Sequence, residues 1–190
     1  MAEGKIIIVS APSGCGKSTI INAVMGSGER DLGFSVSATN RPPRAGEVDG
    51  VNYHFLSTDE FRRRIAAGDF VEYEEVYPGR YYGTLKSEVE RITGAGHNVV
   101  LDIDVKGGVN VKRMYGDRAL SLFIEPPCVE ALRSRLEGRG TESPEEIDKR
   151  VGRAAEELAY ASRYDRRVVN DDLAAATAEV AGVIDSFIGR

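Results

Sequence analysis

The stretch Ile6-Ile-Ile-Val-Ser-Ala-Pro-Ser-Gly-Cys-Gly-Lys-Ser-Thr19 decides the fold of this chain. Its first four residues are apolar and β-branched without alternation, which is typical of a strand buried on both faces of a parallel sheet. A glycine-rich turn follows, and residues 17–25 have the pattern of a helix. A strand, a turn that ends in Gly-Lys-Ser and a helix together predict a P-loop, which binds phosphate through backbone N–H groups and a helix N-terminus.

The phosphate-binding residues expected in this loop are Ser13, Gly14, Cys15, Gly16, Lys17, Ser18 and Thr19. Lys17 is expected to reach the β- and γ-phosphates of a nucleotide, and the Ser18 hydroxyl is expected to bind Mg²⁺. The first position of the motif is Ala11 instead of glycine, which would cost about 1 kcal/mol or more if φ had to be positive there. A structural glycine turn with a chance lysine is the alternative, and the flanking strand and helix disfavour it.

Strand and helix patterns alternate along the rest of the chain. Strands are predicted at 99–101, 120–124 and 168–169, and helices at 85–93, 107–114, 129–137, 144–161 and 173–188. The last but one of these helices has a strong start signal in Ser143-Pro-Glu-Glu146. Alternating strands and helices predict an α/β fold, a three-layer P-loop core around a parallel sheet. Residues 33–84 interrupt the pattern with short β-like runs at 34–37, 51–56 and 70–74, so we expect a mixed-β domain inserted into the core.

Composition excludes several kinds of protein. The net charge is −5, whereas a nonspecific binder of nucleic acid or membranes usually carries a basic excess. Two cysteines and two histidines are too few for a disulfide framework or a Cys/His zinc site. The apolar run near the N-terminus is too short for a signal peptide or a membrane span. We therefore expect a cytoplasmic protein that uses no nucleic-acid polymer and no membrane; the sequence leaves its oligomeric state open.

Charged residues outside the loop point to the same chemistry. Asp102 ends the strand predicted at 99–101 and is expected to hold Mg²⁺ or its waters, although a strand end or helix cap is the ordinary role of such a residue. Arg41 and Arg44 flank two prolines, so their planar side chains are expected to hold one phosphate group together; a solvated loop is the alternative. A second basic group surrounds Gly138-Arg-Gly140 and is expected to close over the transferring phosphoryl group; it comprises Arg133, Arg135, Arg139, Arg150 and Arg153. Within it, Arg133 and Arg153 are expected on a solvent-exposed helix face.

These motifs resemble the guanylate kinase family. The match is carried by Phe34-Ser-Val-Ser-Ala-Thr-Asn-Arg41-x-x-Arg44-x-Gly-Glu-x-x-Gly50-x-x-Tyr53, by the P-loop, by Leu101-Asp-Ile-Asp104, by Leu136-Glu-Gly-Arg-Gly-Thr-Glu and by Val169-Asn-Asp-Asp172, in the family's order and over essentially the whole chain. The resemblance implies transfer of the γ-phosphoryl group of ATP to GMP, and to dGMP, with Mg²⁺, in support of guanine nucleotide supply. It also implies a core at 1–32, 85–135 and 151–190, a GMP-binding domain at 33–84 and a short helical lid at 136–150.

The resemblance also assigns roles to single residues. Arg41, Arg44, Tyr53 and Tyr82 would hold the GMP phosphate, whereas Ser37, Glu72, Thr84 and Asp104 would read guanine. Arg139 and Arg150 would bind the ATP phosphates, and Asn170 would lie near adenine. Lys17, Arg41, Arg44, Arg139 and Arg150 would act in catalysis.

Glu72 illustrates the chemistry behind these roles. Guanine offers two adjacent donors, N1–H and the exocyclic amine, to one carboxylate, and adenine has no N1 proton. A buried Glu72 left unpaired by adenine would select against it. The structural alternative is an outward carboxylate on an alternating strand.

Two alternatives stand beside this function. One is a non-catalytic guanylate-kinase-like binding module, which would typically have lost its P-loop function, whereas Lys17, Ser18, Arg41 and Arg44 are all present. The other is a P-loop kinase for a different phosphorylated acceptor, which Ser37, Glu72 and Asp104 count against.

Cys15 has two opposite interpretations. A position inside the phosphate loop, beside Lys17 and a helix N-terminus, would favour a reactive thiolate, more reactive than Cys128. A small inert residue with its sulfur turned inward is the equal alternative.

Overall fold

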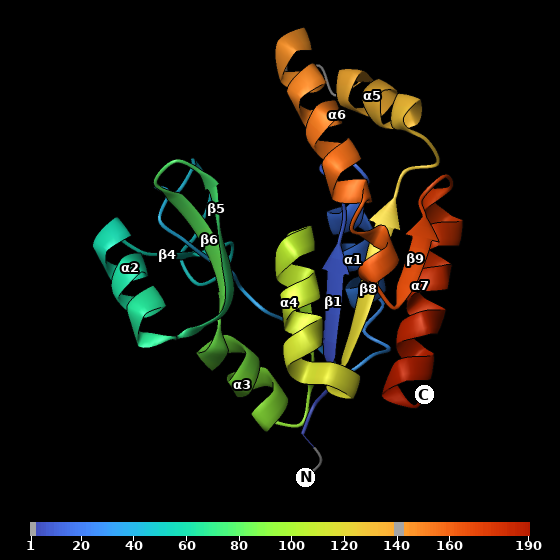
Figure 1. Cartoon of the computed structure of the whole chain (residues 1–190). Helices are drawn as coiled ribbons and strands as arrows, with labels where there is room; N and C mark the ends of the chain where they lie inside the picture. Colours follow the sequence, from blue (N-terminus) through green and yellow to red (C-terminus); the bar gives the residue numbers. More distant parts are fainter. Residues whose placement is uncertain (1–2, 139–142) are drawn as a thin grey trace.

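The computed structural model describes residues 3–138 and 143–190, and two separate sheets organise them (Figure 1). The larger sheet has the strand order β2-β7-β1-β8-β9, and every neighbouring pair is parallel. Its strands are β1 (Ile6–Ser10), β2 (Leu32–Phe34), β7 (Asn98–Asp102), β8 (Ala119–Glu125) and β9 (Arg166–Val169). The parallel sheet predicted from the buried, non-alternating strands is therefore confirmed.

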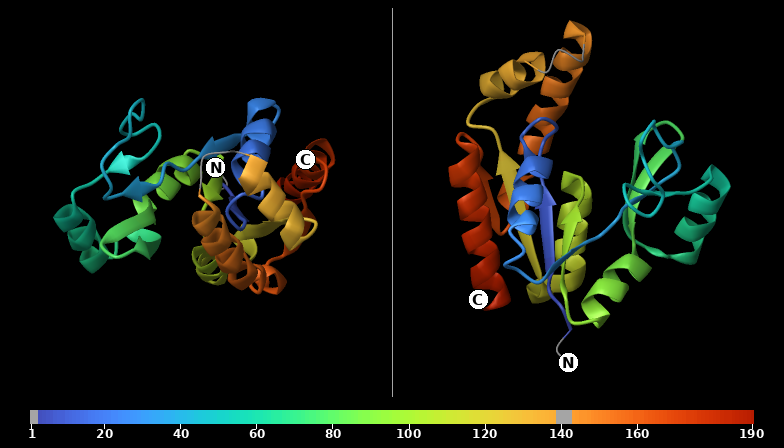
Figure 2. Two further views of the ribbon diagram at one scale, coloured as in Figure 1. Left: turned by 90° about the horizontal axis from the view of Figure 1, so that it is seen from above. Right: turned by 180° about the vertical axis from the view of Figure 1, so that it is seen from behind.

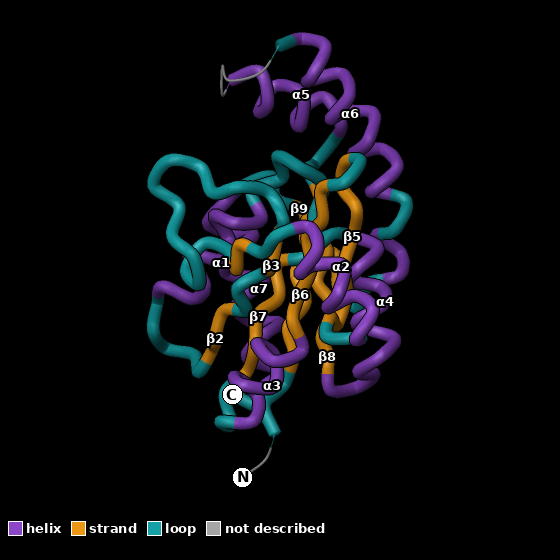
Figure 3. The backbone as a smooth tube through the Cα atoms, turned by 90° about the vertical axis from the view of Figure 1, so that its left-hand side faces the viewer, coloured by secondary structure: helices purple, strands orange, loops and turns teal. Residues whose placement is uncertain are grey.

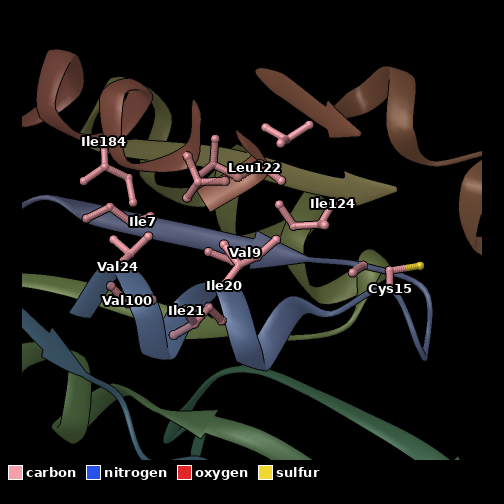
Figure 4. Close-up of a cluster of buried hydrophobic side chains, with 14 of the residues drawn as sticks. Ile7, Val9, Cys15, Ile20, Ile21, Val24, Val100, Leu122, Ile124 and Ile184 are labelled. Atoms are coloured by element: carbon pink, nitrogen blue, oxygen red, sulfur yellow. The ribbon is translucent and has the colours of Figure 1, made fainter. Parts of the chain in front are cut away.

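Helices cover both faces of this sheet, because alternate side chains of each strand point to opposite sides. Ile7 and Val9 pack with helices α1 (Lys17–Gly26) and α7 (Leu173–Ile188) in one buried cluster (Figure 4). On the other face, Ile6 and Ile8 pack with helices α3 (Lys86–Gly94) and α4 (Val105–Tyr115). These two apolar layers confirm the three-layer core.

Two further helices stand above the carboxyl ends of the core strands, α5 (Val129–Gly138) and α6 (Pro144–Leu158) (Figure 1). Helix α6 begins as its sequence predicts: the Ser143 hydroxyl accepts from the Glu146 amide, and the Glu146 carboxylate accepts from the Ser143 amide. The helix ends three residues earlier than expected. Short 3₁₀ turns lie at Gly116–Arg118 and Ala161–Arg163.

The smaller sheet belongs to the inserted unit, which lies to one side of the core and joins it through the segment after β2 and through α3 (Figure 2). Its elements are β3 (Ala38–Thr39), β4 (His54–Phe55), α2 (Thr58–Ala67), β5 (Phe70–Tyr77) and β6 (Arg80–Leu85). The strand order is β4-β3-β6-β5, with β3 and β4 parallel and the other pairs antiparallel, as a mixed sheet requires. Figure 3 views the molecule from the side of this unit.

The structure corrects the predicted boundaries in this region. The strand expected at 34–37 is β2, which ends at Phe34 and pairs with β7, so Gly33 and Phe34 lie in the core sheet. A Cβ atom at Gly33 would lie 2.7 Å from the Ile92 side chain, which explains a glycine where α3 crosses this strand. The strand expected at 51–56 contains only His54–Phe55. Strand β6 was not predicted, although the Pro78-Gly79 turn before it is a hairpin signal.

Candidate active site

Parallel strands deliver their carboxyl ends to one edge of the core sheet, and a cleft of about 630 Å³ opens there toward the inserted unit. Most of the predicted site residues line it. From the core these are Ser13, Gly14, Cys15, Gly16, Lys17, Ser18, Thr19, Asp102 and Asp104; from the inserted unit Ser37, Arg41, Arg44, Tyr53, Glu72 and Tyr82; and from α6 Arg150. Thr84 and Asn170 are buried behind this lining. Arg139 lies outside the described residues.

The phosphate loop depends on two glycines for conformation and for space. Gly14 and Gly16 have φ values of 95° and 82°, which favour glycine, and a Cβ atom at Gly16 would lie 2.5 Å from the Asn170 amide nitrogen. Ala11 does not have a positive φ, so the cost considered for alanine at the first motif position does not arise. The loop therefore has the glycines that its geometry requires.

Asn170 forms a hydrogen bond with the backbone of this loop. Its side-chain amide donates to the Cys15 carbonyl at 2.8 Å and is buried. Asn170 thus contacts the backbone of the loop. The resemblance implies a position near adenine, but Asn170 does not line the cleft. Asn170 follows β9 and is 155 residues away from Cys15 in the chain, so no local pattern indicates this contact.

The structure supports the inert alternative for Cys15. The side chain is 1% exposed at the end of the apolar cluster beyond β1 (Figure 4). Burial raises the pKa of the Cys15 thiol to about 12, since desolvation outweighs the nearby positive charges of Arg135 and Lys17. The expectation that Cys15 is the more reactive cysteine is therefore wrong, and Cys128 is the exposed one.

Iodoacetamide labelling is expected to modify Cys128 first and to leave Cys15 unmodified at pH 8 until the protein is unfolded. Peptide mass spectrometry measures both sites in one sample, with and without Mg-ATP. Labelling of Cys15 in the folded protein, with loss of activity and protection by ATP, would contradict the burial of its sulfur.

Lys17 already has a charged partner in the cleft. Its ammonium group forms an ion pair with Asp102 and donates to the Ile103 carbonyl at 3.4 Å. Strands β1 and β7 are neighbours, and Val9 is opposite Asp102 in their register, so the sheet itself brings the lysine and the carboxylate together. Asp102 therefore lies beside the P-loop, as the sequence predicts.

Arg41 is fixed by a carboxylate that was given no role from the sequence. Its two terminal nitrogens donate to the two carboxylate oxygens of Glu47 at 2.6 Å each, and the Arg44 amide donates to the same carboxylate at 2.7 Å. The guanidinium also lies 4.9 Å from the centre of the Tyr53 ring. These hydrogen bonds lower the pKa of Glu47 to about 2 and raise that of Arg41. In the sequence, Glu47 is marked only as the glutamate after Gly46 in the stretch that resembles the guanylate kinase family.

The Nε donor of Arg41 is unused. Its Nε atom is buried and has no hydrogen-bond partner among the residues that the structure describes. Tyr53 packs edge-on against Tyr82 with ring centres 5.8 Å apart, and both line the cleft beside Arg41. Arg41, Arg44, Tyr53 and Tyr82 therefore come together at one end of the cleft.

The carboxylates expected to read guanine meet where β5 approaches α4. Glu72 is opposite Thr84 in the register of β5 and β6, and the Thr84 hydroxyl donates to Glu72 Oε1 at 2.7 Å. Asp104 caps α4, since its Oδ1 accepts from the amides of Lys106 and Gly107. The outward-facing alternative for Glu72 is wrong, because the residue is buried.

Gly107 makes this approach of the two carboxylates possible. A Cβ atom there would lie 2.7 Å from Glu72 Oε2 and 3.0 Å from Asp104 Oδ2. Burial raises the pKa of Glu72 to about 7, with the charge of Asp104 as a smaller contribution in the same direction. A ligand that offers donors to Glu72 would therefore stabilise its ionised form.

Helix α6 contributes arginines from above the loop. An Arg150 terminal nitrogen donates to the Ser13 hydroxyl at 2.9 Å, and Arg153 also lines the cleft, paired with Glu157. The Arg153 side chain is 45% exposed, so it lies on a solvent-exposed helix face as expected, and it also lines the cleft. Arg133 pairs with Asp148 and does not line the cleft.

In residues 3–138 and 143–190, no three or more His, Cys, Asp or Glu side chains form a group that could hold a metal ion. No helix in the described part of the chain has both the length and the apolar character needed to cross a membrane.

Comparisons with known proteins agree along the whole chain. A family model described as guanylate kinase matches residues 3–187. A guanylate kinase of Bacteroides fragilis is 57% identical over 98% of this chain and 91% of its own length. One of Porphyromonas gingivalis is 54% identical over 98% of this chain and 99% of its own length. The crystal structure of a guanylate kinase from Anaplasma phagocytophilum superimposes with a TM-score of 0.78 at 27% identity, over 100% of this chain and 89% of that one.

Proposed function

Since the chain belongs to the guanylate kinase family and transfers the γ-phosphoryl group of ATP to GMP, we propose that the cleft beside the P-loop holds both nucleotides. ATP would lie at the P-loop, and GMP would lie against the inserted unit. One observation carries this proposal: the P-loop of the core and Arg41, Arg44 and Glu72 of the inserted unit line the same cleft. The acceptor phosphate would then face the γ-phosphate of ATP.

In the donor half, the backbone of the loop and the N-terminus of α1 would hold the triphosphate. Lys17 would exchange its ion pair with Asp102 for contacts with the β- and γ-phosphates. Arg150 is already in contact with Ser13 of the loop, which supports its role near ATP. The resemblance gives Arg139 a similar role.

In the acceptor half, the GMP phosphate would bind Arg41, Arg44, Tyr53 and Tyr82. Glu47 occupies the two terminal nitrogens of Arg41, so the unused Nε atom supports a phosphate contact through that side of the guanidinium. Glu47 would thus orient Arg41 for the acceptor.

Guanine would lie at the junction of β5 and α4. Glu72 would accept from N1–H and the exocyclic amine, and the Thr84 hydroxyl also donates to Glu72 Oε1. Ser37 and the remaining oxygen of Asp104 would complete the pocket. None of these residues is assigned to the ribose 2′-hydroxyl, so we include dGMP as an acceptor.

The transfer needs no covalent intermediate and no general base, because an oxygen of the GMP phosphate is already an anionic nucleophile. The barrier is lowered by in-line positioning and by neutralisation of charge on the transferring group. Lys17, Arg41, Arg44, Arg139 and Arg150 would supply that charge. We expect the inserted unit at 33–84 and the lid at 136–150 to close on the core at 1–32, 85–135 and 151–190 only with both nucleotides bound, which would limit ATP hydrolysis.

Mg²⁺ fits the donors present at the loop. The Ser18 hydroxyl and the Asp102 carboxylate both line the cleft, and Mg²⁺ typically takes one or two protein oxygens plus phosphates and water. We propose these two residues as its protein contacts, where the ion would neutralise charge on the phosphates of bound ATP. We also propose a cytoplasmic site of action on free nucleotides, since the net charge of −5 disfavours nucleic acid or a membrane as partner.

Coupled measurement of ADP release tests this function with GMP, dGMP, AMP and no acceptor. We expect rapid release with GMP, measurable release with dGMP, and rates near background with AMP or no acceptor. A non-catalytic binding module would release no ADP with any acceptor. A kinase for another acceptor would be inactive with GMP.

GMP affinity is expected to rise with pH between about pH 6 and 8. The pKa of Glu72 lies near 7 in the unliganded protein, above its ordinary value of 4.5, and the complex needs the ionised form. GMP binding should therefore release up to one proton below pH 7, and the dissociation constant should change by up to tenfold per pH unit. Titration calorimetry in two buffers of different ionisation enthalpy measures this release. Glu72→Gln is the control, because it retains only the titration of the GMP phosphate; equal proton release in both proteins would contradict the assignment.

A further inference from the structure

Helix α6 presents two arginines and a glutamate to the donor half of the cleft. Arg150, Arg153 and Glu157 follow one another at spacings of three and four residues, which places them on one helix face. Figure 1 shows this helix above the carboxyl end of β1, where the phosphate loop begins. Arg150 is in contact with the loop, so Arg153 lies one helical turn farther along the same face.

The pair between Arg153 and Glu157 is poorly suited to stabilising the helix. Arg153 Nε donates to Glu157 Oε1 at 2.9 Å. The arginine precedes the glutamate by four residues, which is the less favourable order for such a pair in a helix. The Arg153 side chain is also 45% exposed, so solvent weakens the attraction. A role in ligand binding explains the pair better than a role in helix stability.

Glu157 leaves the terminal nitrogens of Arg153 available. Both of these nitrogens lack a hydrogen-bond partner among residues 3–138 and 143–190. The Glu157 side chain is only 15% exposed, and its charge contributes to the raised pKa of Cys15 in the phosphate loop. Arg41 is also held by a carboxylate, but Glu47 binds its two terminal nitrogens, whereas Glu157 binds the Nε atom of Arg153.

We propose that Arg153 binds the phosphates of ATP and that Glu157 orients it for this contact. Lys17 is already paired with Asp102 in the unliganded cleft, whereas the terminal donors of Arg153 are available to an incoming triphosphate. A guanidinium held at its Nε atom presents a planar pair of donors, which matches two phosphate oxygens. This inference rests on the proposed position of ATP at the P-loop.

Steady-state kinetics of Arg153→Gln tests the inference, with Arg133→Gln as the matched control. Arg133 is 44% exposed and is also paired with a carboxylate, but it does not line the cleft. We expect Arg153→Gln to raise the KM for ATP about 5- to 20-fold and to leave the KM for GMP within twofold. Arg133→Gln should change neither constant by more than twofold.

Glu157→Gln separates orientation from simple charge. It should raise the KM for ATP by less than Arg153→Gln does. The double variant should have the same KM for ATP as Arg153→Gln alone, because Glu157 acts only through Arg153. Direct ATP binding in the absence of GMP should weaken in the same order. Thermal melting of each variant measures the fold.

Two results would overturn the inference. One is an unchanged KM for ATP in Arg153→Gln. The other is an equal rise of both KM values together with a lower melting temperature, which would indicate a structural role. Failure of the wild-type protein to form ADP with GMP would instead contradict the proposed function.

Discussion

Lys17→Ala is expected to lower kcat by roughly 10²- to 10³-fold or more, the cost typical of removing a group that stabilises transition-state charge. The ammonium group would follow the β- and γ-phosphates as negative charge redistributes during transfer. GMP affinity should change little, because Lys17 lies in the donor half of the cleft. A coupled ADP assay measures kcat, and calorimetry measures GMP binding.

The same substitution removes the partner of Asp102, so stability needs a separate measurement. The Asp102 carboxylate is partly exposed to water, which limits the cost of leaving it unpaired, and we expect a melting temperature within a few degrees of wild type. Lys149→Ala, at an exposed position of α6, is the control for loss of one positive charge. Turnover within a few-fold of wild type in a folded Lys17→Ala protein would contradict the P-loop assignment.

Glu72→Gln is expected to raise the KM for GMP about 10- to 100-fold and to leave the KM for ATP within twofold. Hydrogen bonds to a charged acceptor contribute about 1.5–3 kcal/mol. Glutamine has only one acceptor oxygen, and its amide NH₂ group is a donor. The Thr84 hydroxyl already donates to Glu72 Oε1, so a glutamine whose oxygen keeps this contact would turn its amide NH₂ group toward guanine. Two donors would then face each other.

Stability distinguishes recognition from structure at this position. The raised pKa of Glu72 means that the ionised carboxylate costs the unliganded protein stability, and this cost grows as the pH rises from about 4.5 to about 7. Glu72→Gln removes that cost, so its melting temperature at pH 8 should equal or exceed that of wild type. Glu90→Gln, at an exposed position of α3, is the charge control. Equal losses of GMP and ATP affinity would show that Glu72 is structural.

The core could be predicted from the sequence because its signals are local. Four β-branched residues identify strand β1, and glycines at a fixed spacing from Lys17 identify the phosphate loop. Both signals lie within the fourteen residues 6–19. The cap of α6 needs only Ser143 and Glu146. The inserted unit was less predictable, since β2 lies in the core sheet only because it pairs with β7, which is more than sixty residues farther along the chain.

The site residues divide in the same way. Lys17, Asp102, Arg41 and Glu72 were identified by residue type and motif, and the structure brings them to one cleft. The contacts of Glu47 with Arg41 were not predicted, and Arg153 lines the cleft as well as lying on an exposed helix face. A charged helix face or loop has the same sequence pattern whether water or a phosphate site lies opposite it.

The sequence by itself determined the phosphate loop, the alternation of strands and helices in the core and the family, because each depends on residue types at short, fixed spacings. Only the tertiary structure decided the chemical state of the side chains. The pKa values of Cys15 and Glu72 are raised because distant segments surround both side chains and exclude water. Asn170 reaches the loop because β9 ends beside β8 in the folded sheet. Desolvation and long-range contacts depend on which atoms lie nearby in space, and that follows from the packing of the whole chain.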